Sequence, residues 1–276
     1  MKIEFFGVRG TAPLTSETSS VYGRNTTCLA VTSRGGDLLV LDGGTGLRAL
    51  GQRLSGLGDL APRRIHLFLT HFHFDHIQGL PFFAPLYAAG TEVSFYSAFS
   101  VHVLRRTLGR FMRPPFFPVK FSETASSKTM AKIGPGPTLV GGIAVKACPL
   151  RHPQSAFAFR LEEGDESFVL ATDTEHPASG VDKRLARFAK GASTLVYDAM
   201  YTPEEYAAGR RGWGHSTWAA ATALARTSGA GRLLLFHLNP DYGDPELESL
   251  ENLARRDFPS AACAREGPLA VWKGRP

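Results

Sequence analysis

Short apolar runs, separated by glycine, proline and polar residues, recur along the 276-residue chain. Runs that are rich in β-branched and aromatic residues and bounded by turn residues predict β-strands. The runs fall at residues 3–8, 28–33, 37–42, 64–70, 91–97, 138–147, 155–161, 166–172, 193–199 and 232–238. Gly35 and Gly36 predict a hairpin turn between two of these strands, and the EEGD stretch at 162–165 predicts another.

Three segments predict helices instead. Leucines recur on one face of residues 46–54 with the spacing of an amphipathic helix. The alanine-rich stretch 216–229 starts with hydroxyl residues suited to an N-cap and stops at a glycine. The apolar run 76–87 predicts a helix that is broken near Pro81 and Pro85.

The order of these elements is strands first, then strands mixed with helices, and the second half repeats it. No sequence repeat has a fixed short period, and the best candidate for a boundary is the PGP stretch at 135–137. We therefore expect an α/β fold in a single domain over residues 1–276, built from two β-rich halves.

Composition bears on the size of the core, the charge of a substrate and the compartment in which the protein works. Apolar residues make up 43% of the chain, enough for a sizeable core, and the net charge of +6 suits an anionic substrate but is also common on ordinary surfaces. Three widely spaced cysteines predict buried thiols in a reducing compartment. The first residues lack a signal-peptide pattern, and no window is apolar enough to span a membrane, so we expect a cytoplasmic protein without membrane contact.

The segment THFHFDHIQGL at 70–80 gathers three of the nine histidines directly after a predicted strand. Residues i and i+2 of an extended segment project to the same side. His71 and His73 can therefore bind one metal ion, whereas Asp75 and His76 point at a neighbouring position. Imidazole nitrogens combined with carboxylate oxygens suit zinc.

One segment cannot complete two metal spheres, so further ligands are needed. His152, Asp173 and His237 each follow or end a predicted apolar strand, as the first cluster does. Each residue alone is a weak signal. As a set at equivalent positions, they predict a shared metal site.

THFHFDH resembles the HxHxDH signature of metallo-β-lactamase-fold hydrolases, and the three downstream residues match the rest of that family's dinuclear ligand set. The resemblance covers nearly the whole chain. It implies a four-layer αββα sandwich with two divalent metal ions, zinc or otherwise manganese, at one edge of two facing sheets. By resemblance, one ion would be held by His71, His73 and His152, and the other by Asp75, His76 and His237, with Asp173 bridging.

The LDGGTG stretch at 41–46 is part of the same resemblance. Its glycines could cradle a phosphate, but the lysine of a P-loop is missing. We favour tight packing beneath the metal site, with Asp42 in a supporting position.

GHST at 214–217 resembles the HST motif of the phosphodiesterase branch of the family, typified by RNase Z. His215 lies just before a predicted helix, where unpaired amides favour phosphate oxygens; a capping or packing role is the alternative. LVYDAMY resembles the HEAT segment of that branch, with Asp198 at its acidic position, so Asp198 could orient His215. Tyr197 replaces the histidine of HEAT, and no tRNA-gripping arm is identified.

Stretches such as YGRNTTC, PPFFPV and ATDTEH are more similar to bacterial cyclic-nucleotide-type phosphodiesterases. The resemblance therefore favours a hydrolase that cleaves a cyclic nucleotide or another small phosphodiester by attack of a metal-bridged hydroxide. His215 would stabilise the transition state or protonate the leaving oxygen, and Asp75 would also accept a proton from water. Alternatives are an RNase Z-like endoribonuclease, a thioester or lactone hydrolase of the same fold, and a non-catalytic binding module. Relatives imply a homodimer by analogy.

Residues 105–121 carry five basic residues, four phenylalanines and no acid. Basic groups contact phosphates and aromatic faces stack on bases, so this segment could contact the substrate. A solvated face above an apolar anchor, or an oligomer contact, is the other interpretation.

Overall fold

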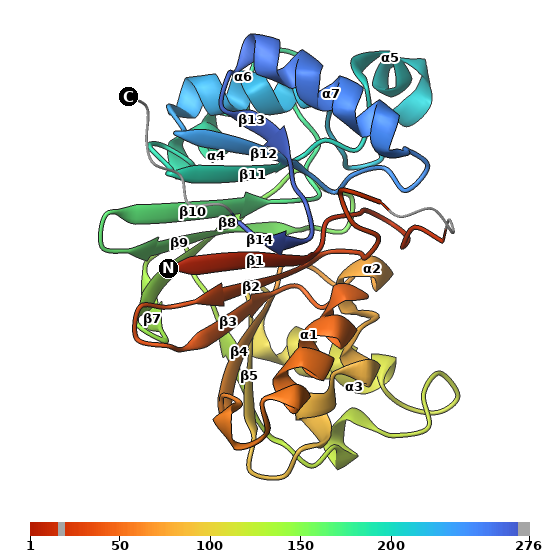
Figure 1. The fold of residues 1–276 in the computed structure, drawn as a ribbon, viewed down its shortest axis with the longest axis vertical. Helices are drawn as coiled ribbons and strands as arrows, with labels where there is room; N and C mark the ends of the chain where they lie inside the picture. The colour runs from red at the N-terminus through yellow and green to blue at the C-terminus, as the bar shows by residue number, and fades with distance from the viewer. Residues whose placement is uncertain (16–19, 270–276) are drawn as a thin grey trace.

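The structure is a computed structural model, and it describes residues 1–15 and 20–269. Two seven-stranded sheets pack face to face, and helices cover the outer face of each (Figure 1). The layers follow the order helix, sheet, sheet, helix. The expected αββα sandwich is confirmed.

The first sheet has the strand order β14-β1-β2-β3-β4-β5-β6. Strands β1, β2 and β3 pair antiparallel, whereas β3, β4, β5 and β6 are parallel neighbours. The bounds are β1 Lys2–Gly7, β2 Cys28–Thr32, β3 Leu38–Leu41, β4 Arg64–Leu69, β5 Glu92–Ser97, β6 Ser127–Lys132 and β14 Gly267–Pro268.

The second sheet repeats this plan in the order β13-β12-β11-β10-β9-β8-β7. Strands β7 to β10 pair antiparallel, and β10 to β13 are parallel. The bounds are β7 Thr138–Val140, β8 Ile143–Pro149, β9 Phe157–Glu163, β10 Glu166–Ala171, β11 Thr194–Asp198, β12 Arg232–Phe236 and β13 Ala261–Cys263. The two β-rich halves thus form two sheets of matching topology, except that β14, near residue 268, returns to the first sheet. The chain passes from the first sheet to the second near the predicted boundary at 135–137.

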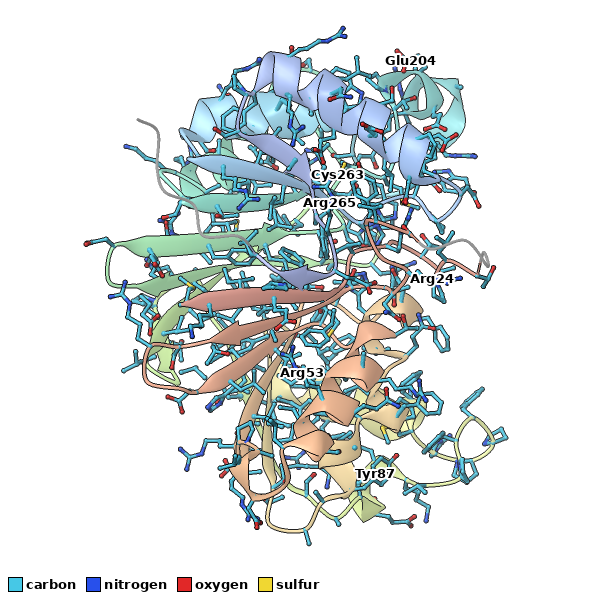
Figure 2. All side chains as sticks on the ribbon, viewed as in Figure 1. Arg24, Arg53, Tyr87, Glu204, Cys263 and Arg265 are labelled. Atoms are coloured by element: carbon cyan, nitrogen blue, oxygen red, sulfur yellow. The ribbon has the colours of Figure 1, made fainter. Side chains whose placement is uncertain are left out.

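Helices α1 (Gly46–Gly56) and α3 (Val101–Phe111) cover the first sheet, and α4 (Lys183–Phe188), α6 (Trp218–Ser228) and α7 (Asp244–Asp257) cover the second (Figure 1). Arg53 of α1 (Figure 2) forms an ion pair with Glu4 of β1, with 2.7 Å between nitrogen and oxygen. The shorter helices are η1 Gly58–Leu60, α2 Phe74–Ile77, η2 Leu80–Phe82, η3 Ala84–Tyr87, η4 Phe121–Glu123, α5 Pro203–Glu205 and η5 Tyr206–Arg210.

Side-chain alternation along the strands explains the layers. Leu29 and Val31 of β2 belong to the buried core shared by the two sheets, whereas Ala30 between them belongs to the core beneath α1 and α3. Leu39 and Val40 of β3 divide in the same way. Both faces of the sheet are therefore apolar, as a sheet covered on both sides requires.

Two predicted elements need correction. Residues 138–147 do not form one strand, because Gly141 and Gly142, both with positive φ, make a tight turn that separates β7 from β8. The predicted helix 76–87 is the end of α2 followed by two short 3₁₀ helices, since the prolines lack the N–H that a continuous helix requires. Strands β6, β13 and β14 and helices α4, α5 and α7 are among the elements that have no counterpart in the prediction.

Two other expectations can be compared with the structure. Cys28, Cys148 and Cys263 are all buried and unpaired, as expected. Among the described residues, no helix is long and apolar enough to cross a membrane. The single domain over 1–276 and the cytoplasmic location stay predictions.

Candidate active site

Seven imidazole and carboxylate groups gather at the edge of the sandwich where α2 lies, and two of them belong to α2 itself. They follow the ends of β4, β8, β10 and β12. Strands that run in the same direction end at the same edge of a sheet, which is why residues far apart in sequence meet there. The groups belong to His71, His73, Asp75, His76, His152, Asp173 and His237.

Unusual backbone geometry marks three strand ends at this edge. Asp42 follows β3, Asp173 follows β10 and His237 follows β12, with φ angles of 59°, 55° and 55°. Residues other than glycine disfavour this left-handed conformation by about 1–2 kcal/mol. Such strain persists where the surrounding structure fixes it, and it concentrates at functional sites.

In the first cluster, His71, His73, His152 and Asp173 each offer a ligand atom, all within 4.8 Å of one another. His73 Nδ1 lies 3.1 Å from His152 Nε2, and His71 Nε2 lies 3.6 Å from Asp173 Oδ1. With Zn–N bonds of 2.0–2.1 Å, two ligands of a tetrahedral ion lie ~3.3 Å apart. The cluster therefore has the size and donor chemistry of a metal site.

The remaining ring nitrogens of these histidines are held by the protein. His71 Nδ1 lies 3.0 Å from Thr70 Oγ1, and His152 Nδ1 lies 3.1 Å from the carbonyl oxygen of Gly214. The other nitrogen of His73 contacts Gln154. His71 Nε2 is buried without a hydrogen-bond partner, which is the arrangement expected of a nitrogen that serves as a metal ligand.

In the second cluster, the Nε2 atoms of two imidazoles each lie within 3.3 Å of oxygens from two carboxylates. His76 Nε2 and His237 Nε2 lie 3.3 and 3.1 Å from Asp75 Oδ2. The same two nitrogens lie 3.2 and 3.3 Å from the two oxygens of Asp173. Asp173 thus contacts both clusters. Asp42 accepts a hydrogen bond from His76 Nδ1 at 2.8 Å, the supporting position that was expected for it.

Charge is concentrated in this buried site. Burial alone would raise the pKa of Asp75, but His76 and His237 outweigh it and lower the pKa far below its usual value. Burial would likewise raise the pKa of Asp173, but His237 and His76 lower it well below its usual value. Burial would lower the pKa of His76, yet Asp173 and Asp75 raise it well above the ordinary value. The surrounding imidazoles thus favour the charged form of both carboxylates.

His215 and Asp198 form a pair on the second-half side of the site. His215 Nδ1 lies 2.8 Å from Asp198 Oδ2, and the other oxygen of Asp198 accepts a 2.9 Å hydrogen bond from the backbone N–H of Ser216. The His215 ring stacks on His237, with 4.8 Å between centroids. Burial would lower the pKa of His215, but Asp198, with help from Asp173, raises it to about 9. The contact between the two predicted residues exists, and it leaves Nε2 as the nitrogen available for other partners.

The LDGGTG turn packs tightly under the site. A Cβ added to Gly44 would lie 2.4 Å from the carbonyl oxygen of Asp75 and from the hydroxyl of Thr26. Only glycine allows this close approach. The expected packing role of these glycines is therefore confirmed.

Sequence reasoning missed the residue that anchors the loop before α6. Glu175 accepts hydrogen bonds from the hydroxyl of Tyr206 at 2.6 Å and from the backbone N–H groups of Gly212 and Gly214 at 2.8 and 3.1 Å. Since the carbonyl of Gly214 also contacts His152, the loop is fixed directly to the metal-site residues. An acid two positions after Asp173 was the only signal in the sequence.

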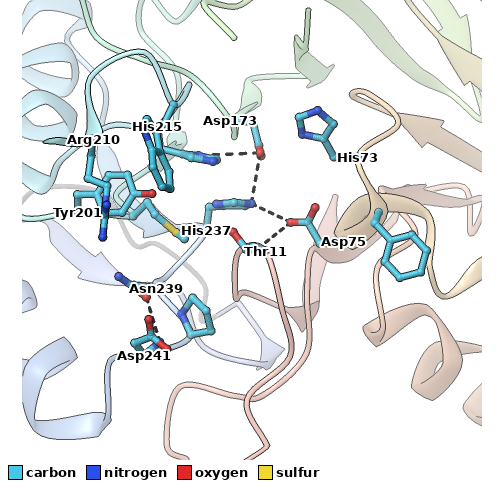
Figure 3. A pocket seen from close by; sticks show the side chains of 14 residues that line it. Thr11, His73, Asp75, Asp173, Tyr201, Arg210, His215, His237, Asn239 and Asp241 are labelled. Atoms are coloured by element: carbon cyan, nitrogen blue, oxygen red, sulfur yellow. Dashed lines mark hydrogen bonds and ion pairs between the residues drawn. The ribbon is translucent and has the colours of Figure 1, made fainter. Parts of the chain in front are cut away.

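Four of the candidate ligands, His73, Asp75, Asp173 and His237, line a pocket of about 480 Å³ (Figure 3). Phe74, Tyr201, Arg210 and Trp213 are among the other residues that line it. No residue of the described segment 105–121 lines this pocket. Phe111 of that segment packs edge-on against Phe74 of the pocket lining, with 5.8 Å between ring centroids.

Comparison with known proteins identifies the class. A family profile described as "Beta-lactamase superfamily domain" matches residues 38–238, so the chain belongs to this superfamily. Ribonuclease BN of Escherichia coli O1:K1 / APEC is 25% identical over 247 residues, which cover 72% of this chain and 79% of the relative.

Solved structures agree with this fold. YhfI from Bacillus subtilis, described as a metallo-beta-lactamase fold protein, is similar with a TM-score of 0.71 and 20% identity over 97% of both chains. A diphosphatase from the PhnP family is similar with a TM-score of 0.70 and 17% identity over 98% of both chains. The chain thus has a hydrolase-type metallo-β-lactamase fold, with a nuclease and a diphosphatase among the proteins that it resembles.

Proposed function

We propose that the protein is a dinuclear metal-dependent phosphodiesterase that acts on a cyclic nucleotide or another small phosphodiester. The observation that carries this proposal is the joint placement of two metal-ligand clusters and the His215–Asp198 pair around one pocket. Phosphodiester cleavage requires charge stabilisation at the phosphoryl oxygens together with a donor for the leaving oxygen. The site offers groups for both tasks.

The donor atoms fit divalent ions and favour zinc, because imidazole nitrogens outnumber carboxylate oxygens. Bound ions would lower the pKa of water toward ~7 and neutralise charge on the phosphoryl group. One ion would lie among His71, His73 and His152, and the other among Asp75, His76 and His237, with Asp173 shared.

The protein's own side chains divide the remaining work. Asp198 holds His215 Nδ1, so His215 Nε2 can hydrogen-bond to a phosphoryl oxygen or donate to the leaving oxygen. Asp75 Oδ2 accepts a 2.8 Å hydrogen bond from the backbone N–H of Thr11, and Asp75 can also accept a hydrogen bond that orients the attacking water. A positioned proton donor such as His215 typically contributes ~10²–10⁴-fold to the rate.

A parallel screen tests the proposal. Metal content is measured first, and the protein loaded with zinc or manganese is then assayed with bis-p-nitrophenyl phosphate, a 2′,3′-cyclic nucleotide, a thioester and a short structured RNA. We expect hydrolysis of the two small phosphodiesters. Absence of bound metal, or a preference for the thioester, would contradict the proposal.

The second candidate is an RNase Z-like endoribonuclease, which the similarity to Ribonuclease BN favours. It predicts preferential cleavage of the RNA, with an activity that falls steeply as salt rises. A thioester or lactone hydrolase would prefer the thioester, and a binding module would be silent with all four substrates. Homodimerisation stays a prediction that light scattering can test.

A further inference from the structure

We propose that Tyr201, Arg210 and Trp213 form a recognition wall that selects phosphodiesters with an aromatic nucleobase beside the scissile phosphate. This inference rests on the proposed function and specifies its substrate class. The three residues are termed the recognition wall below.

The recognition wall belongs to the same pocket as the candidate metal ligands. Its residues share that pocket with Asp173 and His237. Figure 3 shows Arg210 and Tyr201 on one side and Asp75 on the other, with His237 between them. A substrate whose phosphate lies at the metal ligands would therefore extend one substituent toward the wall.

The wall offers aromatic surface to a ligand. Trp213 is 54% exposed although it is a large aromatic residue, whereas Tyr201, which lines the same pocket, is largely buried. Stacking of a base on an aromatic side chain contributes about 1–3 kcal/mol and tolerates different bases. An exposed indole at the mouth of a catalytic pocket suits this role.

Arg210 adds an oriented cation. Its guanidinium carbon lies 4.7 Å from the ring centroid of Trp213 and 5.8 Å from that of Tyr201. Within residues 1–15 and 20–269, no ion pair or side-chain hydrogen bond involves this guanidinium; its contacts are with the two rings. A planar guanidinium held against rings keeps its N–H groups free for oxygen acceptors, which a base carbonyl or a phosphate provides.

The position of the wall relative to the metal ligands is fixed. Glu175 binds both Tyr206, before Arg210, and the backbone of Gly212 and Gly214, on either side of Trp213. The carbonyl of Gly214 contacts His152. The distance from base to phosphate is thus set by the loop, which is the requirement for selecting one substituent over another.

A matched pair of substrates tests the inference. Thymidine 5′-p-nitrophenyl phosphate and methyl p-nitrophenyl phosphate have the same charge and the same leaving group, but only the first carries a base. We expect the wild-type protein to prefer the thymidine substrate in kcat/KM by ~5–150-fold, the equivalent of one stacked base. Trp213→Ala and Arg210→Ala should each reduce this preference severalfold or more, mainly through KM for the thymidine substrate.

Conservative variants and a neighbouring residue serve as controls. Trp213→Phe should retain most of the preference because it keeps an aromatic face, and Arg210→Lys should retain less because it loses the planar fork. Arg211→Ala removes an adjacent exposed charge that does not line the pocket, and it should leave both activities unchanged. Metal content and melting temperature identify any variant that has lost its fold.

The possible failures are distinguishable. If the metal-loaded protein hydrolyses neither substrate, the proposed phosphodiesterase function is wrong. If it hydrolyses both with equal kcat/KM, the recognition wall is overturned while the function stands. Equal losses on both substrates in Trp213→Ala and Arg210→Ala, with Trp213→Phe no better than Trp213→Ala, would overturn the wall as well.

Discussion

The two halves of the sandwich supply the candidate site in different ways. The first half provides four of the seven candidate ligands from one stretch, residues 71–76, directly after β4. The second half provides one residue after each of β8, β10 and β12. The first set is close because of local chain geometry, whereas the second is close only because strands of one sheet end at a common edge.

The halves also differ in what surrounds the ligands. Behind the first-half ligands, Asp42 receives hydrogen bonds from His76 and Thr70. Behind the second-half ligands, Asp198 receives one from His215. His215 is outside the two proposed ligand sets, although it forms a third group with Asp173 and His237 whose potential ligand atoms lie within 4.8 Å of one another. We infer that the first half is specialised for holding metal, while the second half adds proton transfer and substrate recognition.

The largest effect is expected where the halves meet. Asp173→Ala removes the one carboxylate that contacts both clusters. Metal content should fall for both positions, and activity should fall by more than the ~10²–10³-fold typical of losing a single electrostatic donor. Elemental analysis and kcat/KM measure this. His102→Ala, at an exposed histidine outside the site, is the control, and full metal retention in Asp173→Ala would refute the shared role.

A large effect confined to the second half is expected from His215→Ala. It should lower kcat by ~10²–10⁴-fold because the donor to the leaving oxygen is lost. Metal content should stay near that of the wild type, since His215 is outside the two proposed ligand sets. Metal loss as great as in Asp173→Ala would make His215 a ligand and would erase the distinction between the halves.

Effects of intermediate size are expected from substitutions of the two supporting carboxylates, Asp42 and Asp198, and the two substitutions should affect different properties. Asp42→Asn should weaken metal affinity by ~10–100-fold, because it loosens the hydrogen bond that orients His76. Asp198→Asn should lower kcat, by less than His215→Ala does, and change metal affinity less than Asp42→Asn. Metal titration and kinetics on both variants decide the matter; identical profiles would show that the division of labour is wrong.

The smallest effect is expected from the basic segment 105–121. Replacing Arg105, Arg106 and Arg110 together with alanine should change kcat/KM for a small phosphodiester by less than about threefold, because these exposed charges do not line the pocket and salt screens them. A large loss on structured RNA in the same variant would favour the endoribonuclease alternative.

Strand patterns could predict that the candidate ligands meet, because each follows or ends an apolar strand. THFHFDH follows β4, and Asp173 and His237 follow β10 and β12, so strand patterns alone indicate a common edge. The pairing of His215 with Asp198 needed the family resemblance, since nothing local brings residues 17 positions apart into contact.

Other features depend on contacts that no local pattern encodes. Glu175 reaches the loop before α6 across 31 to 39 positions, so its role and the recognition wall emerge only in three dimensions. Helix α7 was missed because Glu251 occupies a core-facing position and interrupts the apolar stripe. That buried carboxylate is paired with Arg255 and Arg265, which the spacing of hydrophobic residues cannot reveal.

Anomalous diffraction at the zinc edge, from crystals grown with zinc, tests the central claim most directly. We predict two anomalous peaks at the edge of the sandwich that carries the candidate ligands. One peak should lie among His71, His73 and His152 and the other among Asp75, His76 and His237, both in contact with Asp173. Absence of peaks there, or zinc bound elsewhere while these side chains point apart, would contradict a dinuclear site assembled from both halves.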